Sequence, residues 1–218
     1  MRKLKDLEEA SETPEEQMKK LAEEVRKCRK CNLWMTRKNP VPGEGNVRAE
    51  VMFIGEAPGK SEDEQGRPFV GAAGKLLTKL IESIGLSREE VYIANVLKCR
   101  PPNNRDPLPE EIEKCTPYLD RQIKIIKPKI IVTLGRHSTK YILGKLRVSV
   151  PGIMKVRGKT YSGTILGLKV IILPTLHPAA ALYNPKMKSI IEADFKNLKS
   201  IIEGKVKQAD LLKFLSFK

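Results

Sequence analysis

The sequence predicts an α/β fold, a parallel sheet with helices on both of its faces. The chain of 218 residues has the length of one domain. Four short apolar runs fit strands that are buried on both faces, at residues 51–55, 91–95, 130–135 and 168–174. Helical patterns lie between and after them, at about 73–84, 109–126, 136–144 and 186–203. Alternation of this kind is typical of a parallel sheet.

The first expected element is an amphipathic helix from Thr13 to Arg26. Thr13 suits the N-cap, Pro14 the first helical position, and Glu16 follows the cap by three residues, as in a capping box. Residues 39–49 are expected to form a loop, and residues 158–166 are a candidate edge strand. We therefore divide the chain into one domain, residues 1–204, and a separate basic tail, residues 205–218.

The charge favours a polyanionic partner. The chain has 41 Lys+Arg against 26 Asp+Glu, a formal net charge of +15. Nucleic acid is the first candidate and an anionic membrane surface the second. A thermophilic surface rich in Lys and Glu is the alternative, and a thermophilic source fits the composition. Thermostability explains many charges of both signs but not their imbalance, so we expect nucleic acid.

The four cysteines point to a metal site. The N-terminus has no apolar run of the kind found in signal peptides, and no segment approaches the roughly 20 apolar residues of a membrane span. We therefore expect a cytoplasmic protein, in which disulfides are rare. Cys28 and Cys31 have C-x-x-C spacing, and Cys99 and Cys115 follow. Four thiolates suit zinc or a [4Fe–4S] cluster, and the spacing does not choose between them. Buried, unligated thiols are the alternative.

Three polar side chains follow the ends of predicted strands. Glu56 comes directly after the first strand, Asn95 ends the second, and His177 follows the last. Open parallel sheets bind ligands outside the carboxyl ends of their strands. Each residue alone has an ordinary reading as a cap or a satisfied polar group. Together, a carboxylate, an amide and an imidazole at one edge predict a reactive site.

The segment GEAPGKS, residues 55–61, resembles a phosphate-binding P-loop but does not fit one. It has three residues between its glycines instead of four. Pro58 lacks a backbone donor, and Glu56 would place a negative charge among phosphates. No predicted strand ends in the Asp that would hold magnesium. Nucleotide hydrolysis is therefore not expected.

Three segments resemble the family 4 uracil-DNA glycosylases, the iron–sulfur type of thermophilic bacteria and archaea. They are GEAPGKSEDEQGRPFVGAAGKLL (55–77), ANVLKCRPPNNR (94–105) and LHPAAALYNP (176–185). The resemblance covers about residues 20–203. It implies a three-layer α/β/α fold around a four-stranded, mostly parallel sheet. It also implies a monomer whose four cysteines hold a structural [4Fe–4S] cluster, with zinc as the alternative, and the excision of uracil from DNA.

The resemblance assigns the uracil pocket to particular side chains. Phe69 matches the aromatic residue on which the flipped base stacks; its other reading is a core Phe. Asn95 matches the residue that reads uracil, since one amide pairs with O4 and N3–H together. Cytosine reverses that pattern, so we expect neighbouring groups to fix the Asn95 amide. The backbone of Ala57 and Pro58 would line the pocket.

The same resemblance implies how the bond is broken. His177 matches the donor to uracil O2, which stabilises the departing anion. Glu56 matches the acidic residue that stabilises the oxocarbenium-like sugar or orients the attacking water; its other reading is a helix N-terminal carboxylate. Glu62 matches a position that crowds the 5-methyl group of thymine. His137, which lacks the basic insert of another branch of the superfamily, is read as structural or phosphate-contacting.

Other segments are expected to contact DNA or a partner protein. Residues 178–183 match the loop that enters the minor groove, with Leu182 as the wedge. Tyr183 stands where relatives often carry arginine, so it would stack where they bind phosphate. Arg100 and Arg105 are expected against the DNA backbone. The tail resembles the short motif that holds the sliding clamp, or it packs on its own domain; its anchors would be Gln208, Leu211, Phe214 and Leu215.

We therefore predict a monofunctional glycosylase that flips uracil out of single- or double-stranded DNA and leaves an abasic site. The alternative is a non-catalytic module of the same fold that binds DNA and uses the metal cluster as a scaffold. A zinc-containing nucleic-acid protein is a third, more distant reading.

Overall fold

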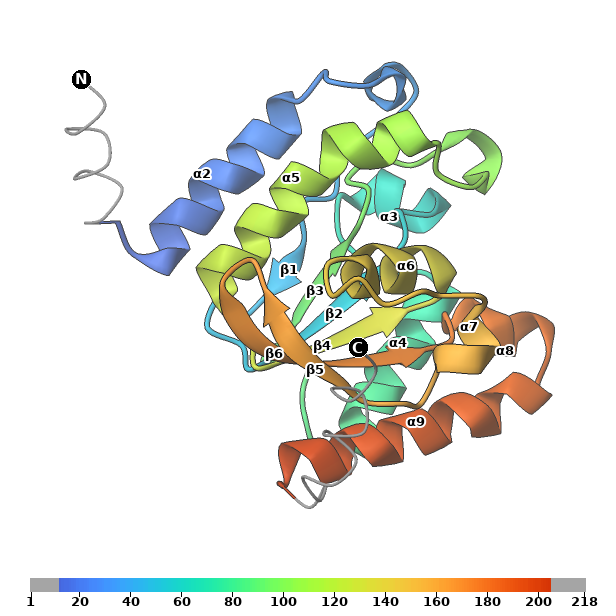
Figure 1. Ribbon diagram of the computed structural model, residues 1–218. Helices are drawn as coiled ribbons and strands as arrows, with labels where there is room; N and C mark the ends of the chain where they lie inside the picture. The colour runs from blue at the N-terminus through green and yellow to red at the C-terminus, as the bar shows by residue number, and fades with distance from the viewer. Residues whose placement is uncertain (1–11, 205–218) are drawn as a thin grey trace.

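A computed structural model describes residues 12–204 of the chain. Its centre is a six-stranded sheet in the order β1-β3-β2-β4-β6-β5 (Figure 1). The strands are β1 (Glu44–Gly45), β2 (Val51–Gly55), β3 (Tyr92–Asn95), β4 (Ile130–Leu134), β5 (Tyr161–Ile165) and β6 (Leu168–Thr175). The clamp-motif residues Gln208, Leu211, Phe214 and Leu215 lie outside the described residues.

The predicted α/β/α class is confirmed, but the sheet is larger than the four strands expected. The four predicted strands form its parallel centre, β3-β2-β4-β6. An antiparallel strand is added at each edge, β1 beside β3 and β5 beside β6. The candidate edge strand at 158–166 is β5. Strand β1 lies in the segment expected to be loop, because two residues are too short to show an alternating pattern.

Helices cover both faces of the sheet. The longer ones are α2 (Pro14–Lys27), α4 (Ala72–Ser83), α5 (Pro109–Ile126), α6 (Arg136–Gly144) and α9 (Lys186–Ile202). Short helices α3 (Lys60–Gln65), α7 (Ile153–Val156) and α8 (Ala179–Tyr183) and the 3₁₀ turns η1 (Asn32–Met35) and η2 (Pro102–Asn104) lie in the connections. Figure 1 shows α2, α5 and α6 above the sheet and α4 and α9 below it. The expected capping box of Thr13 and Glu16 begins α2.

Alternate residues of β2 divide the core into two halves. Met52 and Ile54 pack with buried side chains of α2, α5 and α6. Val51 and Phe53 pack with those of α4 and α9, and the Phe53 ring stacks on Phe195 of α9 at 5.8 Å. A strand buried on both faces keeps its position fixed from two sides. The residues that follow β2, β3 and β6 are therefore held at one edge of the sheet.

Within residues 12–204, no helix combines the length and the apolar character needed to cross a bilayer.

Candidate active site

A cavity of about 310 Å³ lies at the carboxyl ends of the central strands. We call it the base pocket. It is bounded by the turn after β2, the end of β3, the loop before α4 and the segment after β6. All seven side chains assigned to uracil binding from the sequence line it: Glu56, Ala57, Pro58, Glu62, Phe69, Asn95 and His177. Residues up to 121 positions apart in the sequence thus meet at one site, while their roles stay predictions.

Asn95 ends β3 at the bottom of the base pocket. It is only 1% exposed, and its Oδ1 atom is buried with no hydrogen-bond partner in the described part of the chain. Burying an unpaired acceptor costs about 1–3 kcal/mol, so such atoms are rare in folded proteins. A ligand that donates a hydrogen bond would satisfy this oxygen. The orphaned acceptor is therefore the polar feature that most specifically describes what the pocket binds.

Gly55 makes room for the Asn95 side chain. It ends β2 and pairs with Asn95 in the parallel register. A Cβ atom on Gly55 would lie 2.3 Å from Asn95 Oδ1 and 2.6 Å from Cζ of Phe69. Both contacts are shorter than real Cβ contacts. Only glycine at position 55 therefore allows the amide and the aromatic ring to occupy the same pocket.

Lys98 fixes the backbone of Asn95 from behind. Its ammonium group donates to the Asn95 carbonyl at 2.8 Å and to Oε1 of Gln122 at 2.6 Å. Gln122 in turn donates to the Pro42 carbonyl at 2.7 Å. Lys98 is 1% exposed, and burial lowers its pKa to about 8. The neighbouring groups expected around Asn95 thus hold its backbone, whereas its amide is confined by the packing against Gly55.

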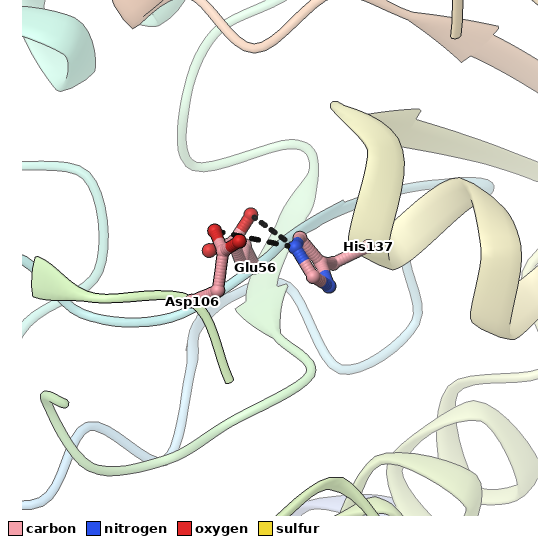
Figure 2. A group of neighbouring side chains, drawn as sticks. All are labelled: Glu56, Asp106 and His137. Atoms are coloured by element: carbon pink, nitrogen blue, oxygen red, sulfur yellow. Dashed lines mark ion pairs between the residues drawn. The ribbon is translucent and has the colours of Figure 1, made fainter. Parts of the chain in front are cut away.

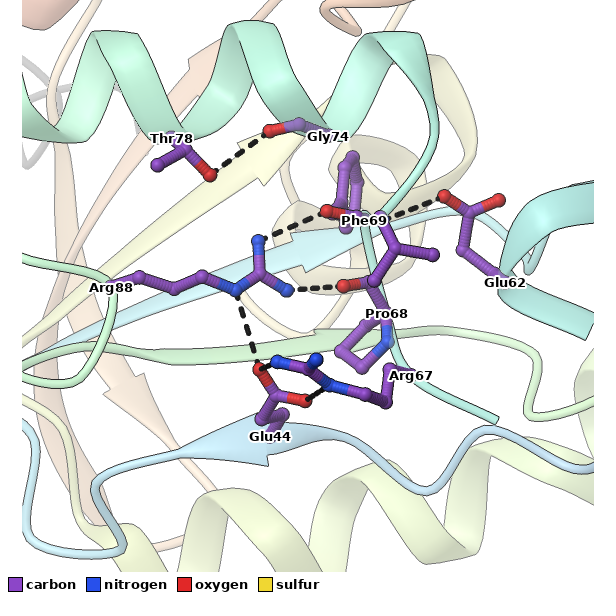
Figure 3. A network of polar contacts seen from close by, with 9 residues as sticks. Glu44, Glu62, Arg67, Pro68, Phe69, Gly74, Thr78 and Arg88 are labelled. Atoms are coloured by element: carbon purple, nitrogen blue, oxygen red, sulfur yellow. Dashed lines mark hydrogen bonds and ion pairs between the residues drawn. The ribbon is translucent and has the colours of Figure 1, made fainter. Parts of the chain in front are cut away.

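Phe69 adopts an unusual backbone conformation to enter the pocket. Its φ of 51° lies in the left-handed region, which non-glycine residues seldom adopt. Figure 3 shows how Arg88 holds this loop: it donates to the carbonyls of Pro68 and Phe69 and is paired with Glu44 of β1. The Phe69 ring faces His177, with centroids 5.5 Å apart and planes 28° from parallel. Phe69 is thus a wall of the pocket as well as a buried residue.

Glu62 holds the same loop from the other side. Its Oε1 accepts from the amides of Val70 and Gly71, both at 2.9 Å, and its Oε2 accepts from the amide of Gly59 at 3.1 Å. The carboxylate therefore caps α3 and ties it to the residues that follow Phe69. Glu62 therefore positions the loop that carries Phe69, and it also lines the pocket.

His177 is neutral near pH 7 and presents a donor. Desolvation by burial lowers its pKa to about 4. Its Nδ1 accepts from the amide of Ala179 at 3.2 Å, so the neutral ring carries its proton on Nε2. Gly135, with φ of +91°, allows this approach, because a Cβ there would lie 3.1 Å from His177 Cβ. A neutral N–H donor in the base pocket is the result.

Glu56 lies beside His137 and Asp106 (Figure 2). The His137 Nε2 atom is 3.8 Å from Glu56 Oε2 and 3.5 Å from Asp106 Oδ1. Arg136 donates to His137 Nε2 at 3.0 Å and is ion-paired with Asp106. Burial raises the pKa of Glu56, and the neighbouring His137 opposes the rise. His137 thus lies next to Glu56, the predicted catalytic carboxylate. The sequence prediction for His137, a structural or phosphate-contacting residue, did not include this position.

Neither Asp106 nor the position of His137 beside Glu56 was predicted from the sequence. Asp106 has no sequence signal of its own, since it follows η2 in an irregular loop. His137 had one: it comes three residues after β4, at the same edge of the sheet as Glu56. Lys98 was also missed, because its burial depends on Gln122, 24 residues further along the chain.

The four cysteines meet in a second cavity, away from the base pocket. Cys28 follows α2, Cys31 precedes η1, Cys99 follows β3 and Cys115 lies in α5. Burial raises the pKa of Cys31 and Cys99, and that of Cys115 to about 12. Thiols held in such a place need a metal or a neighbouring cation to ionise.

The surroundings of the sulfur atoms fit a metal centre. Arg37 donates to Cys99 Sγ at 3.0 Å, and the Lys98 amide donates to Cys115 Sγ at 3.2 Å. Both would stabilise thiolates.

The residues assigned to DNA contact divide into two sets. Leu182 and Tyr183, on α8, are 49% and 90% exposed, which suits contact with a large ligand. Tyr183 lines the base pocket. Arg105 also lines it, but its guanidinium is paired with Glu111 at 2.5 Å. Arg100 donates to Asn104 Oδ1 at 2.8 Å. The two arginines are thus engaged within the protein, and a DNA contact would have to share or replace those partners.

The fold and the pocket define a class of protein. The family model of the uracil DNA glycosylase superfamily matches residues 42–199, the sheet and every wall of the base pocket. Among similar proteins, the Type-4 uracil-DNA glycosylase of Saccharolobus solfataricus is 60% identical over 186 residues, 85% of this chain and 86% of that protein. That of Sulfurisphaera tokodaii is 60% identical over 185 residues, 84% of each chain. That of Archaeoglobus fulgidus is 50% identical over 200 residues, 92% of this chain and all of that protein.

Within that superfamily, the chain belongs to the type-4 uracil-DNA glycosylases, as the sequence motifs indicated.

Proposed function

We propose that this chain excises uracil from DNA by hydrolysing its N-glycosidic bond, and that the base pocket is where it does so. The observation that supports the site best is the buried, unpartnered Oδ1 atom of Asn95 in a cavity walled by Phe69 and His177. A base in a duplex cannot reach this cavity, so the nucleotide must first be flipped out, at a cost of a few kcal/mol. The product is an abasic site in the DNA.

Base selection would take place at Asn95. Uracil carries a proton on N3, which Oδ1 accepts, and an O4 oxygen, to which the amide nitrogen donates. Cytosine has no proton on N3 and would leave Oδ1 buried and unpaired. That penalty, about 1–3 kcal/mol, gives roughly 5- to 150-fold discrimination at this atom. Lys98 supports the selection, because it fixes the backbone from which the amide projects.

Rejection of thymine would depend on the pocket wall. Thymine differs from uracil by a 5-methyl group, so a wall that cannot move excludes it. Glu62 is in that wall and is held by three backbone amides. We therefore assign Glu62 to crowding of the methyl group through a rigid loop.

Bond cleavage would be assisted by a neutral donor, His177, and a carboxylate, Glu56. As the bond breaks, its electrons pass to uracil, and the Nε2–H of His177 donates to the O2 atom that becomes negative. One such donor contributes about 10²- to 10³-fold in rate. The Glu56 carboxylate stabilises the positive sugar or orients the water whose oxygen bonds to C1′. The water's proton leaves, and uracil departs as an anion that is later protonated.

We propose a [4Fe–4S] cluster on Cys28, Cys31, Cys99 and Cys115, with zinc as the alternative. The meeting of the four cysteines in one cavity supports a metal centre, and the resemblance to the iron–sulfur glycosylases favours the cluster over zinc. Its contribution is structural: it would join α2, η1, α5 and the loop after Asn95. Metal analysis separates the alternatives, since a cluster gives about four iron atoms per chain and visible absorbance, whereas zinc gives no colour.

We propose one catalytic domain, residues 1–204, and a tail, residues 205–218. The tail would bind a sliding clamp through Gln208, Leu211, Phe214 and Leu215. The protein would act in the cytoplasm as a monomer. Deleting residues 206–218 should spare excision and weaken the capture of the chain by the clamp. Unchanged capture would remove the tail proposal.

The deciding experiment uses an oligonucleotide with one uracil, treated with the protein and then with alkali, which cleaves abasic sites. Wild-type protein should cleave at the uracil. Asn95→Ala and His177→Ala should each lower single-turnover excision by roughly 10²-fold or more while DNA binding survives. Binding without any cleavage would instead support the non-catalytic module, and wild-type rates in both variants would refute the assigned site.

A further inference from the structure

A second hollow lies next to the base pocket, on the other side of α8. It is a groove of about 540 Å³ between α4 and α9, and α8 packs against both helices. We call it the lysine groove. Leu76, Leu80 and Ala181 contribute apolar surface. Its charged residues all come from the two long helices: Lys75, Lys79, Lys188, Lys196 and Glu192.

The lysines form two rows that face each other. Lys75 and Lys79 are four residues apart on α4, and Lys188 and Lys196 are eight apart on α9, so each pair lies on one face of its helix. All four are exposed. The carboxylate among them, Glu192, lies 3.8 Å from Lys188. Four ammonium groups against one carboxylate give the groove a net charge of +3, which suits a polyanion.

One short helix separates this groove from the base pocket. Ala179 and Tyr183 of α8 line the base pocket, and Ala181 and Leu182 line the lysine groove. A polymer with one unit in the base pocket could therefore continue over α8 into the groove. Leu182, 49% exposed, lies at that crossing. The groove is thus continuous with the site at which the flipped nucleotide enters.

We propose that the lysine groove holds the DNA backbone that adjoins the flipped nucleotide, with its lysines on successive phosphates. The proposal rests on the proposed function and adds a surface that extends the DNA contact beyond the lesion. A second copy of this chain is a poor occupant, because a surface of a protein with formal net charge +15 would approach four lysines. DNA supplies negative charge along its whole length and is already joined to the neighbouring pocket.

The test is the salt dependence of binding to a uracil-free duplex. Each phosphate contact adds about 0.9 to the slope of log K against log salt on B-DNA. Replacing Lys75, Lys79, Lys188 and Lys196 with Gln should reduce the slope by about 2–4. The control replaces four other exposed lysines, Lys19, Lys27, Lys124 and Lys169, with Gln. It changes the net charge equally, so it separates local contacts from the field of the whole protein. Equal slopes in the two variants would overturn the proposal.

A second measurement locates the contact along the DNA. Duplexes with one uracil are shortened on one side of it, then on the other. Removing the side that occupies the groove should weaken wild-type binding and leave the groove variant nearly unaffected, since that variant has already lost those contacts. Equal losses of DNA affinity in both proteins, whichever side is shortened, would contradict the proposal. A dimer that the wild-type protein forms and the groove variant does not would contradict it as well. Because the salt slope is measured without uracil, failure of excision leaves this test intact.

Discussion

At the scale of single residues, two absent groups shape the base pocket: a side chain at Gly55 and a hydrogen-bond partner for Asn95 Oδ1 in the described residues. Gly55 lacks a side chain where a Cβ would collide with both Asn95 and Phe69. Asn95 Oδ1 lacks a partner in the described residues, although it is buried. Both features reduce the stability of the empty protein and prepare the pocket for a ligand. A stability cost at a site of this kind is typical of functional residues.

Gly55→Ala should therefore inactivate the site without unfolding the protein. The new Cβ would push the Asn95 amide or the Phe69 ring from its place, and a displacement near 1 Å can cost roughly 10²-fold in rate. Single-turnover excision measures the loss, and thermal unfolding checks the fold. Gly144→Ala is the control, because a Cβ there meets nothing within 4 Å. A wild-type rate in Gly55→Ala would show that the pocket is less constrained than these distances indicate.

His177 should make stability depend on pH in a defined window. Its pKa is about 4 in the folded protein and near 6.5 when the chain unfolds, so below pH 6.5 the unfolded state binds a proton that the folded state does not. The free energy of unfolding should therefore fall as the pH drops from about 6.5 to 4, by at most about 3 kcal/mol from this residue. Urea unfolding at several pH values measures it. His177→Gln should lose that part of the dependence, and an identical curve would contradict the assignment.

At the scale of elements, short segments place the functional groups, and the long ones support them. α3 supplies Glu62, whose carboxylate accepts from three amides. α8 separates the base pocket from the lysine groove. β1 supplies Glu44, which pairs with Arg88 and so supports the loop of Phe69. The long helices α5 and α9 cover the two faces of the sheet on which these segments rest.

Glu62→Ala should destabilise the protein by about 2–4 kcal/mol, because it leaves the amides of Gly59, Val70 and Gly71 without their acceptor. Excision should fall with it, since Phe69 adjoins the released loop. Chemical denaturation gives the free energy. Glu64→Ala is the matched control: Glu64 has the same side chain on the same helix, and its carboxylate makes one exposed ion pair, at 3.6 Å to Lys38, which is worth little. If the two substitutions cost the same, Glu62 does not hold the loop.

The elements that are long enough to show a period could be predicted from the sequence. The four central strands and the five long helices were found because their apolar residues repeat over several turns or form continuous runs. β1, α3, α7 and α8 have two to six residues and show no such repeat. Glu56, Asn95 and His177 were predicted because strand ends of a parallel sheet share one edge. The other pocket residues, Ala57, Pro58, Glu62 and Phe69, were predicted from the family resemblance. Lys98 and Asp106 were not, since their tasks depend on tertiary partners that no local pattern reveals.

At the scale of the whole molecule, one loop connects the base pocket to the cavity that the four cysteines line. The loop between β3 and α5 begins at Asn95 in the base pocket and reaches Cys99 four residues later. Lys98 lies between them, with its ammonium on the Asn95 carbonyl and its amide on Cys115 Sγ. Cys28, directly after α2, and Cys115 in α5 line the same cavity although they are 87 residues apart in the sequence. A metal centre here would therefore brace both the base-reading strand and the outer helix layer.

Cys99→Ala should damage the molecule in a particular order. Loss of one ligand would weaken the metal centre and free the loop after Asn95, so the melting temperature and DNA affinity should fall first. The ratio of uracil to cytosine excision should change least, because Lys98 and Gly55 still hold Asn95. Metal content, thermal unfolding and the two excision rates measure this order. Arg37→Gln provides a milder variant, since it removes a donor to Cys99 Sγ and keeps every cysteine. A selectivity that collapses while stability and affinity stay intact would place the cysteine centre in base recognition itself, contrary to a structural role.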